Sequence, residues 1–117
     1  MRNFRKLEIW NQGIDLAVRA YELSKQLPLE ERYGLKSQIT RAVVSIPSNI
    51  AEGNSRTSEN ELKRSLEISL GSSFELETDL IIVEKSGFIN SVLIQDYLAS
   101  VHVEQEQINS LITRIKG

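Results

Sequence analysis

The chain has 117 residues, of which 40% are hydrophobic and 26% charged, and its formal net charge at pH 7 is −2. This composition is typical of a globular protein and excludes a disordered or fibrous class, and the length predicts one domain over residues 1–117. The sequence has no cysteine and no apolar run long enough to cross a bilayer, so we expect a cytoplasmic protein with no membrane partner.

The first predicted helix covers about residues 7–26 and ends before Pro28. It carries two neighbouring apolar stripes with helical spacing. One stripe is Leu7, Trp10, Ile14, Ala17 and Tyr21, and the other is Ile9, Gly13, Leu16, Ala20 and Leu23. Together they cover more of the helix than one neighbour needs, which predicts burial against two partners in a bundle or an oligomer.

The second predicted helix covers about residues 34–53, with an apolar face and with Gly53 expected as a left-handed cap. Pro47 lies inside it. Its ring removes an amide donor and collides with the carbonyl of Val43, so the pattern favours a kink. The alternative is a helix that stops near Ser45 and begins again with Pro47 in its first turn.

The third predicted helix begins at Ser58 with a capping box, in which the Ser58 hydroxyl accepts from the amide of Glu61 and the Glu61 side chain reaches back, and it ends at Lys85 before Gly87. Its middle contains four small residues in five positions, which predicts a close approach to another helix. These residues are Ser69, Gly71, Ser72 and Ser73.

The fourth predicted helix covers about residues 91–115 and carries an apolar seam with one polar position, Gln105, which we expect to be buried and to fix the helix register. The four helices are joined by short connections, and no strand pattern competes with them. We therefore predict an all-α, antiparallel up-down-up-down four-helix bundle with a proline-kinked second helix.

Five polar residues of the second helix share an arc of roughly 80° at 100° per residue. They are Arg41, Ser45, Asn49, Glu52 and Arg56, and we call them the polar stripe. The stripe fits a structural hydrogen-bond network between helices or subunits. It also fits an anion or RNA phosphate site built on Arg41 and Arg56.

The sequence offers no nucleophile, base and orienting group in one arrangement, so no catalytic residue is assigned and an enzyme is not expected. His102 is the only histidine and has no second ligand at helical spacing other than carboxylates, so we expect no metal and no cofactor. The carboxylates Glu67, Glu75 and Asp79 are interpreted as a solvated face.

Several short motifs resemble a known family: the small bacterial four-helix-bundle proteins encoded within intervening sequences of large-subunit ribosomal RNA genes. They are Tyr33-Gly34-Leu35, Ser37-Gln38, Arg41-Ala42, Ser45-Ile46-Pro47, Asn49-Ile50-Ala51-Glu52-Gly53, Arg56, Gly71-Ser72 and Glu75-Leu76. The resemblance implies a ring-shaped homopentamer. A distant relative, the accessory protein of diversity-generating retroelements, binds RNA and a reverse transcriptase, but it is basic, whereas this chain is mildly acidic.

Two functions follow as hypotheses. The first is a non-enzymatic homo-oligomeric scaffold or adaptor, whose partner is the chain itself as a homopentamer. The alternative is an RNA-binding accessory protein linked to ribosomal RNA intervening sequences or a mobile element, with RNA or a nucleic-acid enzyme as its partner. Its cations would be Arg2, Arg5, Lys6, Arg41, Arg56, Lys63 and Arg64.

Overall fold

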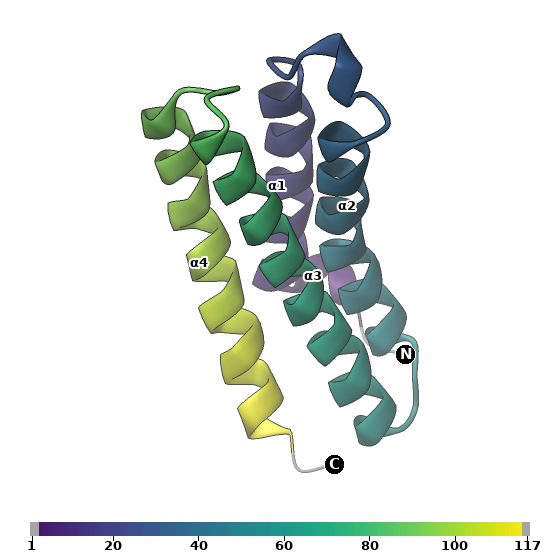
Figure 1. The fold of residues 1–117 in the computed structure, drawn as a ribbon. Helices are drawn as coiled ribbons and strands as arrows, with labels where there is room; N and C mark the ends of the chain where they lie inside the picture. Colours follow the sequence, from purple (N-terminus) through teal and green to yellow (C-terminus); the bar gives the residue numbers. More distant parts are fainter. Residues whose placement is uncertain (1–2, 116–117) are drawn as a thin grey trace.

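Four long helices lie side by side in the computed structural model, which describes residues 3–115 (Figure 1). The elements are η1 (Phe4–Lys6), α1 (Glu8–Ser24), η2 (Leu29–Glu31), α2 (Leu35–Asn54), α3 (Glu59–Lys85) and α4 (Ser91–Arg114). Each helix packs against the next along the chain, and α1 also contacts α4. The described residues contain no strand, so the all-helical bundle is confirmed, with helix ends within two residues of those predicted.

Local capping explains where α3 and α4 begin and where α3 ends. The Ser58 hydroxyl accepts hydrogen bonds from the amides of Asn60 and Glu61 at 3.1 and 3.3 Å, which confirms the serine half of the predicted capping box. The Asn90 side chain accepts from the amide of Val92 at 2.8 Å in the same role. Gly87, at φ 75°, supplies the left-handed residue that terminates α3.

Gly53 does not cap α2, and that prediction is wrong. The helix continues through Asn54, and Ser55 after it keeps a right-handed φ of −84°. A Cβ built on Gly53 would lie 2.7 Å from the Cβ of Ser65 on α3. Glycine is therefore required here by the close approach of two helices and not by backbone handedness.

The small residues of α3 divide into two groups. Ser69, Ser72 and Ser73 are buried, and the Ser69 hydroxyl donates to the Ile46 carbonyl of α2 at 2.9 Å, so the serines mark a close contact as predicted. Gly71 is exposed, and a Cβ built there would meet nothing within 4 Å. The prediction was wrong for Gly71, which points away from the contact.

Gly71→Ala is therefore expected to stabilise the chain by about 1 kcal/mol, because alanine has the higher helix propensity and no neighbour opposes its methyl group. The midpoint of urea unfolding measures the change. A lower midpoint than that of the wild type would contradict an open position at Gly71.

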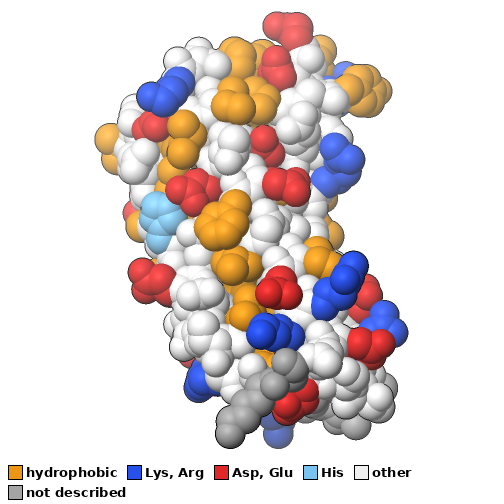
Figure 2. Space-filling view, turned by 60° about the horizontal axis from the view of Figure 1, so that its bottom comes forward, with side chains coloured by type: hydrophobic (Ala, Val, Ile, Leu, Met, Phe, Trp, Pro, Cys, Tyr) orange, Lys and Arg blue, Asp and Glu red, His pale blue; other side chains and the backbone are white. Residues whose placement is uncertain are grey.

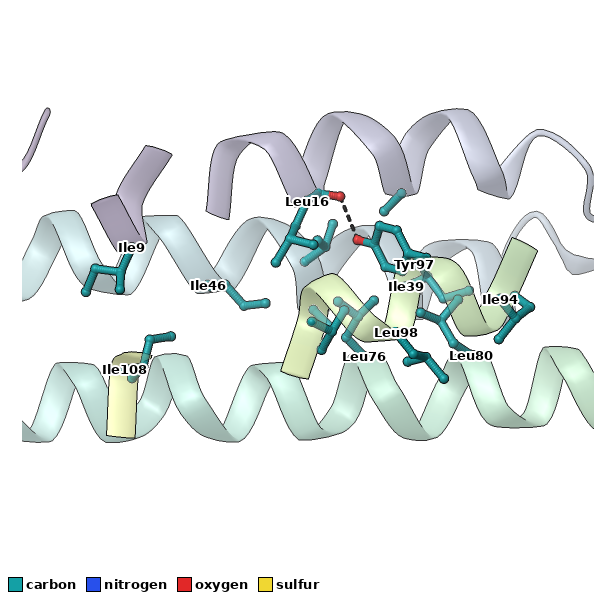
Figure 3. Close-up of a cluster of buried hydrophobic side chains, with 14 of the residues drawn as sticks. Ile9, Leu16, Ile39, Ile46, Leu76, Leu80, Ile94, Tyr97, Leu98 and Ile108 are labelled. Atoms are coloured by element: carbon teal, nitrogen blue, oxygen red, sulfur yellow. Dashed lines mark hydrogen bonds between the residues drawn. The ribbon is translucent and has the colours of Figure 1, made fainter. Parts of the chain in front are cut away.

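The core runs along the bundle axis and draws residues from all four helices (Figure 3). Tyr97 of α4 is buried in it, and its hydroxyl donates to the carbonyl of Leu16 on α1 at 2.6 Å. Of the two stripes on α1, the one containing Leu16 faces this core. The other is partly exposed, with Ile14 at 40% and Tyr21 at 50%. The chain itself therefore supplies a full partner for only one stripe.

Candidate functional site

The middle of the polar stripe forms a hydrogen-bond network between α2 and α3. The Ser45 hydroxyl lies 2.7 Å from that of Ser72. The Asn49 side-chain amide donates to both the carbonyl and the hydroxyl of Ser45, each at 2.9 Å. These groups satisfy one another, as polar groups at a helix contact must.

Arg41 begins the stripe at a shallow hollow of about 380 Å³ between α2 and α3. The hollow also holds Glu75, and the neighbouring Asp79 is buried, not solvated as predicted. Burial raises the pKa of Asp79, the charge of Glu75 raises it further, and Arg41 opposes both. The positive charge of Arg41 is thus balanced by carboxylates, which makes the hollow a poor site for an anion.

Glu52 and Arg56 occupy the other end of the stripe, where they form an i,i+4 ion pair of 3.0 Å with both side chains about half exposed. Such a pair contributes only about 0.3–0.5 kcal/mol. Arg41 lies in the second turn of α2, and Arg56 follows the end of the helix at Asn54. At 1.5 Å per residue, the helix spans roughly 20 Å along its axis from Arg41 to Asn54. The two arginines therefore do not meet at one phosphate.

Pro47 lies within one continuous helix, because α2 runs without interruption from Leu35 to Asn54. The alternative of a helix that stops near Ser45 and starts again is not what the structure shows. Pro47 is buried and faces Gly13 of α1, whose ideal Cβ position lies 3.2 Å from the Cβ of Pro47. The size of the bend at Pro47 stays a prediction.

Glu104 of α4 is fully buried, although no pattern in the sequence singles it out. Neither of its carboxyl oxygens has a hydrogen-bond partner, and burial, followed by the charge of Glu8, raises the pKa of Glu104 to about 8. Gln105, predicted to be the buried polar residue, is only half-buried and donates to Glu77 of α3 at 2.9 Å. Helical spacing alone does not tell which of Glu104 and Gln105 is buried, because each lies three or four positions from both Val101 and Ile108.

His102 contacts α3 through Glu77, with its Nε2 atom 3.0 Å from a carboxylate oxygen. The hydrogen bond from Gln105, and then that of His102, lowers the pKa of Glu77. No group of three or more His, Cys, Asp or Glu residues within 3–115 is placed to hold a metal ion. Over the same residues, no helix is both long and apolar enough to cross a membrane.

The family model described as 23S rRNA-intervening sequence protein matches residues 5–113. The chain belongs to this family. The resemblance found in the sequence motifs is thereby confirmed.

A crystal structure of a protein of unknown function from the S23 ribosomal protein family of Bacteroides thetaiotaomicron VPI-5482 has a similar fold, with a TM-score of 0.82 at 24% identity. The match covers 89% of this chain and 97% of that one. At this identity the likeness supports the fold alone. No curated protein matches the chain.

Proposed function

We propose that this 23S rRNA-intervening sequence protein is a non-enzymatic homo-oligomeric scaffold or adaptor, an up-down-up-down bundle bent at Pro47 that assembles into a ring of five. The observation that carries the proposal is an apolar groove on the outside of α1 and α2. The groove holds about 300 Å³ and is lined by Phe4, Trp10, Ile14, Ala17, Val44, Pro47, Ser48 and Ala51.

This groove is built from the outer stripe of α1 and the flank of α2. Ile14 and Val44 are each 40% exposed, and Phe4 of η1 packs its ring edge-on against Trp10 with 5.2 Å between centroids. A continuous apolar groove of this kind differs from scattered apolar residues and marks an interaction surface. A second copy of the chain is the occupant that the homo-oligomer requires.

Exposed apolar side chains also lie on α3, a helix that does not line the groove. They are Ile68, Phe74 and Ile82, exposed by 47, 51 and 45%. Figure 2 shows hydrophobic side chains in a broken line down one face, flanked by charged ones and by the single histidine. Apolar side chains on two different parts of one chain suit head-to-tail contacts, which form a ring when the rotation between copies closes.

The polar stripe supports a structural role better than a chemical one. Ser45, Asn49 and Ser72 bond to one another, and Glu52 pairs with Arg56. None of these residues is a nucleophile held by a general base, so the stripe has no arrangement for acyl or phosphoryl transfer.

Light scattering coupled to size-exclusion chromatography tests the assembly. Five copies of the 13.3-kDa chain form a particle of roughly 67 kDa, which is the expected mass. A clean monomer at micromolar concentration would overturn the proposal.

Ile14→Glu is expected to dissociate the oligomer while leaving the chain folded. The carboxylate stays hydrated in the free chain, where Ile14 is 40% exposed, but docking would bury it without a partner at a cost of several kcal/mol. We expect association to weaken by about 100-fold or more, measured by light scattering over a concentration series, with an unchanged helical circular dichroism spectrum.

Val92→Glu is the control for Ile14→Glu, because Val92 is 75% exposed at the start of α4 and does not line the groove. It should leave the oligomer intact. Equal dissociation by both variants would argue against docking at the groove.

RNA binding is the second candidate, since the family is named for intervening sequences of 23S rRNA. Arg5 and Lys6 lie on η1, which contacts α2, and Lys63 and Arg64 lie in the first turns of α3 beside Glu59 and Glu61. Arg2 is outside the described residues. The acidic neighbours weaken such a site, and a salt-sensitive complex with 23S rRNA fragments is the result that would favour it.

A further inference from the structure

Glu104 is a buried ionisable group for which the proposed function has no use. It is fully buried on α4, and neither carboxyl oxygen has a hydrogen-bond partner among the described residues. One turn later, the Oε1 atom of Gln107 is also buried without a partner. Buried polar atoms are normally paired, so three unpaired oxygens on adjacent turns of one helix are exceptional.

The carboxyl group occupies a socket where α4 meets α1 and α2. A Cβ built on Gly13 of α1 would lie 3.2 Å from the Oε2 atom of Glu104 and 3.2 Å from the Cβ of Pro47. The absence of a side chain at Gly13 thus leaves the space that the carboxyl group fills. Pro47, with its rigid ring inside α2, forms the opposite wall.

The charges around the socket favour the neutral carboxylic acid. From α1, Glu8 acts on Glu104 with like charge. Arg114 of α4 lines the hollow that Glu8 and Gln107 also line, but neither carboxyl oxygen of Glu104 is hydrogen-bonded to it or to any other described residue. Pro47 contributes only an apolar ring, and Gln107 is uncharged. Burial without a cation or an amide donor disfavours the carboxylate form.

The seam between α1 and α4 is the place where the bundle is most open. These two helices have the sparsest packing of the neighbouring pairs. Two hollows of about 340 and 220 Å³ lie along the seam, one lined by Glu8 and Gln107 and the other by Leu16 and Ser100. Two hydrogen bonds tie the helices together beside the second hollow: the Tyr97 hydroxyl donates to the Leu16 carbonyl, and Arg19 donates to the Ser100 hydroxyl.

We propose that Glu104 is a proton-dependent latch on this seam: α1 and α4 close over the neutral carboxylic acid and separate locally when it ionises. On ionisation the proton passes to water and leaves a carboxylate facing Glu8 with no donor. Opening the adjacent hollows lets water solvate that charge. The latch lies inside the chain's own core and does not rest on the proposed oligomer.

The direction of the pH effect follows from linkage. Glu104 holds its proton more tightly in the folded chain, with a pKa of about 8 against the ordinary 4.5. The contribution of Glu104 to the free energy of unfolding is therefore most favourable below pH 4.5 and falls as the pH rises from 4.5 to about 8. Inside that window one proton is released on unfolding, so the unfolding constant rises about tenfold per pH unit.

The test compares the wild type with Glu104→Gln, which keeps the shape and cannot ionise. Urea unfolding from pH 5 to 9 should show the tenfold-per-unit trend in the wild type and its loss in the variant. Glu106→Gln, the same change at an exposed position on α4, should follow the wild type. Equal pH profiles for the wild type and E104Q would overturn the latch.

Two measurements on the unmodified chain make the test independent of the variant's folding. The carboxyl carbon of Glu104, followed by NMR, should titrate near pH 8, and a midpoint near 4.5 would overturn the proposal. Hydrogen exchange, corrected for its intrinsic pH dependence, should accelerate in α1 and α4 more than in α2 and α3 as Glu104 ionises. An equal change in all four helices would rule out local opening.

Discussion

Gly53→Ala is expected to destabilise the chain by roughly 2–3 kcal/mol, although alanine is the better helix former by about 1 kcal/mol. The added methyl group would lie 2.7 Å from the Cβ of Ser65 and 3.2 Å from a methyl carbon of Leu62. A Cβ atom moves only with its backbone, so α2 and α3 must separate. These two helices form the most extensive contact in the bundle, and the separation would loosen the Ser45–Ser72 and Ser69–Ile46 bonds along it.

The matched control for Gly53→Ala is Gly71→Ala, the same chemical change inside a helix of the same pair, at a position with open space around it. Urea unfolding of the two variants should give shifts of opposite sign. Equal gains in stability would mean that α2 and α3 lie farther apart in solution than the distance of 2.7 Å between the ideal Cβ position of Gly53 and the Cβ of Ser65 implies.

The contrast between these glycines shows what the sequence could and could not predict. Helix positions were predictable because periodicity and caps are local: Ser58 and Gly87 act within a few residues of themselves. The role of Gly53 depends on Ser65, a residue on another helix, and no local pattern contains that distance. A glycine near a helix end has the same sequence signature in both roles.

The candidate site was predictable only in part for a related reason. Helical spacing places Arg41, Ser45 and Asn49 on one face, and this face does lie along α3. Spacing does not tell where α3 leaves α2, so it could not separate the network from the exposed Glu52–Arg56 pair. The burial of Asp79 and Glu104 was not predicted. A difference of less than 100° in the angular position of a residue around the helix axis decides whether its side chain faces solvent or the core, and helical spacing does not fix that angle closely enough.

Glu104→Met is expected to stabilise the chain by about 3 kcal/mol at pH 7, the largest gain that any single substitution considered for this chain should give. An acid whose pKa rises from 4.5 to about 8 on folding costs about that much at pH 7, because the unfolded chain releases the proton that the folded chain retains. Methionine has a similar length, no charge and good helix propensity, so it fits the socket without this cost. At pH 5 the same linkage predicts a gain of only about 1 kcal/mol.

Urea unfolding of Glu104→Met at pH 5, 7 and 8 checks both the size and the trend, and Glu106→Met at the neighbouring exposed position should change stability little at any of them. A gain independent of pH would show that methionine stabilises by packing alone and that Glu104 does not titrate on unfolding. Glu104 lies in a socket formed by Gly13 and Pro47 and lowers the free energy of unfolding at pH 7. An acid in this position is explained if the seam between α1 and α4 has to open. The stabilised variant should therefore also show the slowest hydrogen exchange along that seam at alkaline pH.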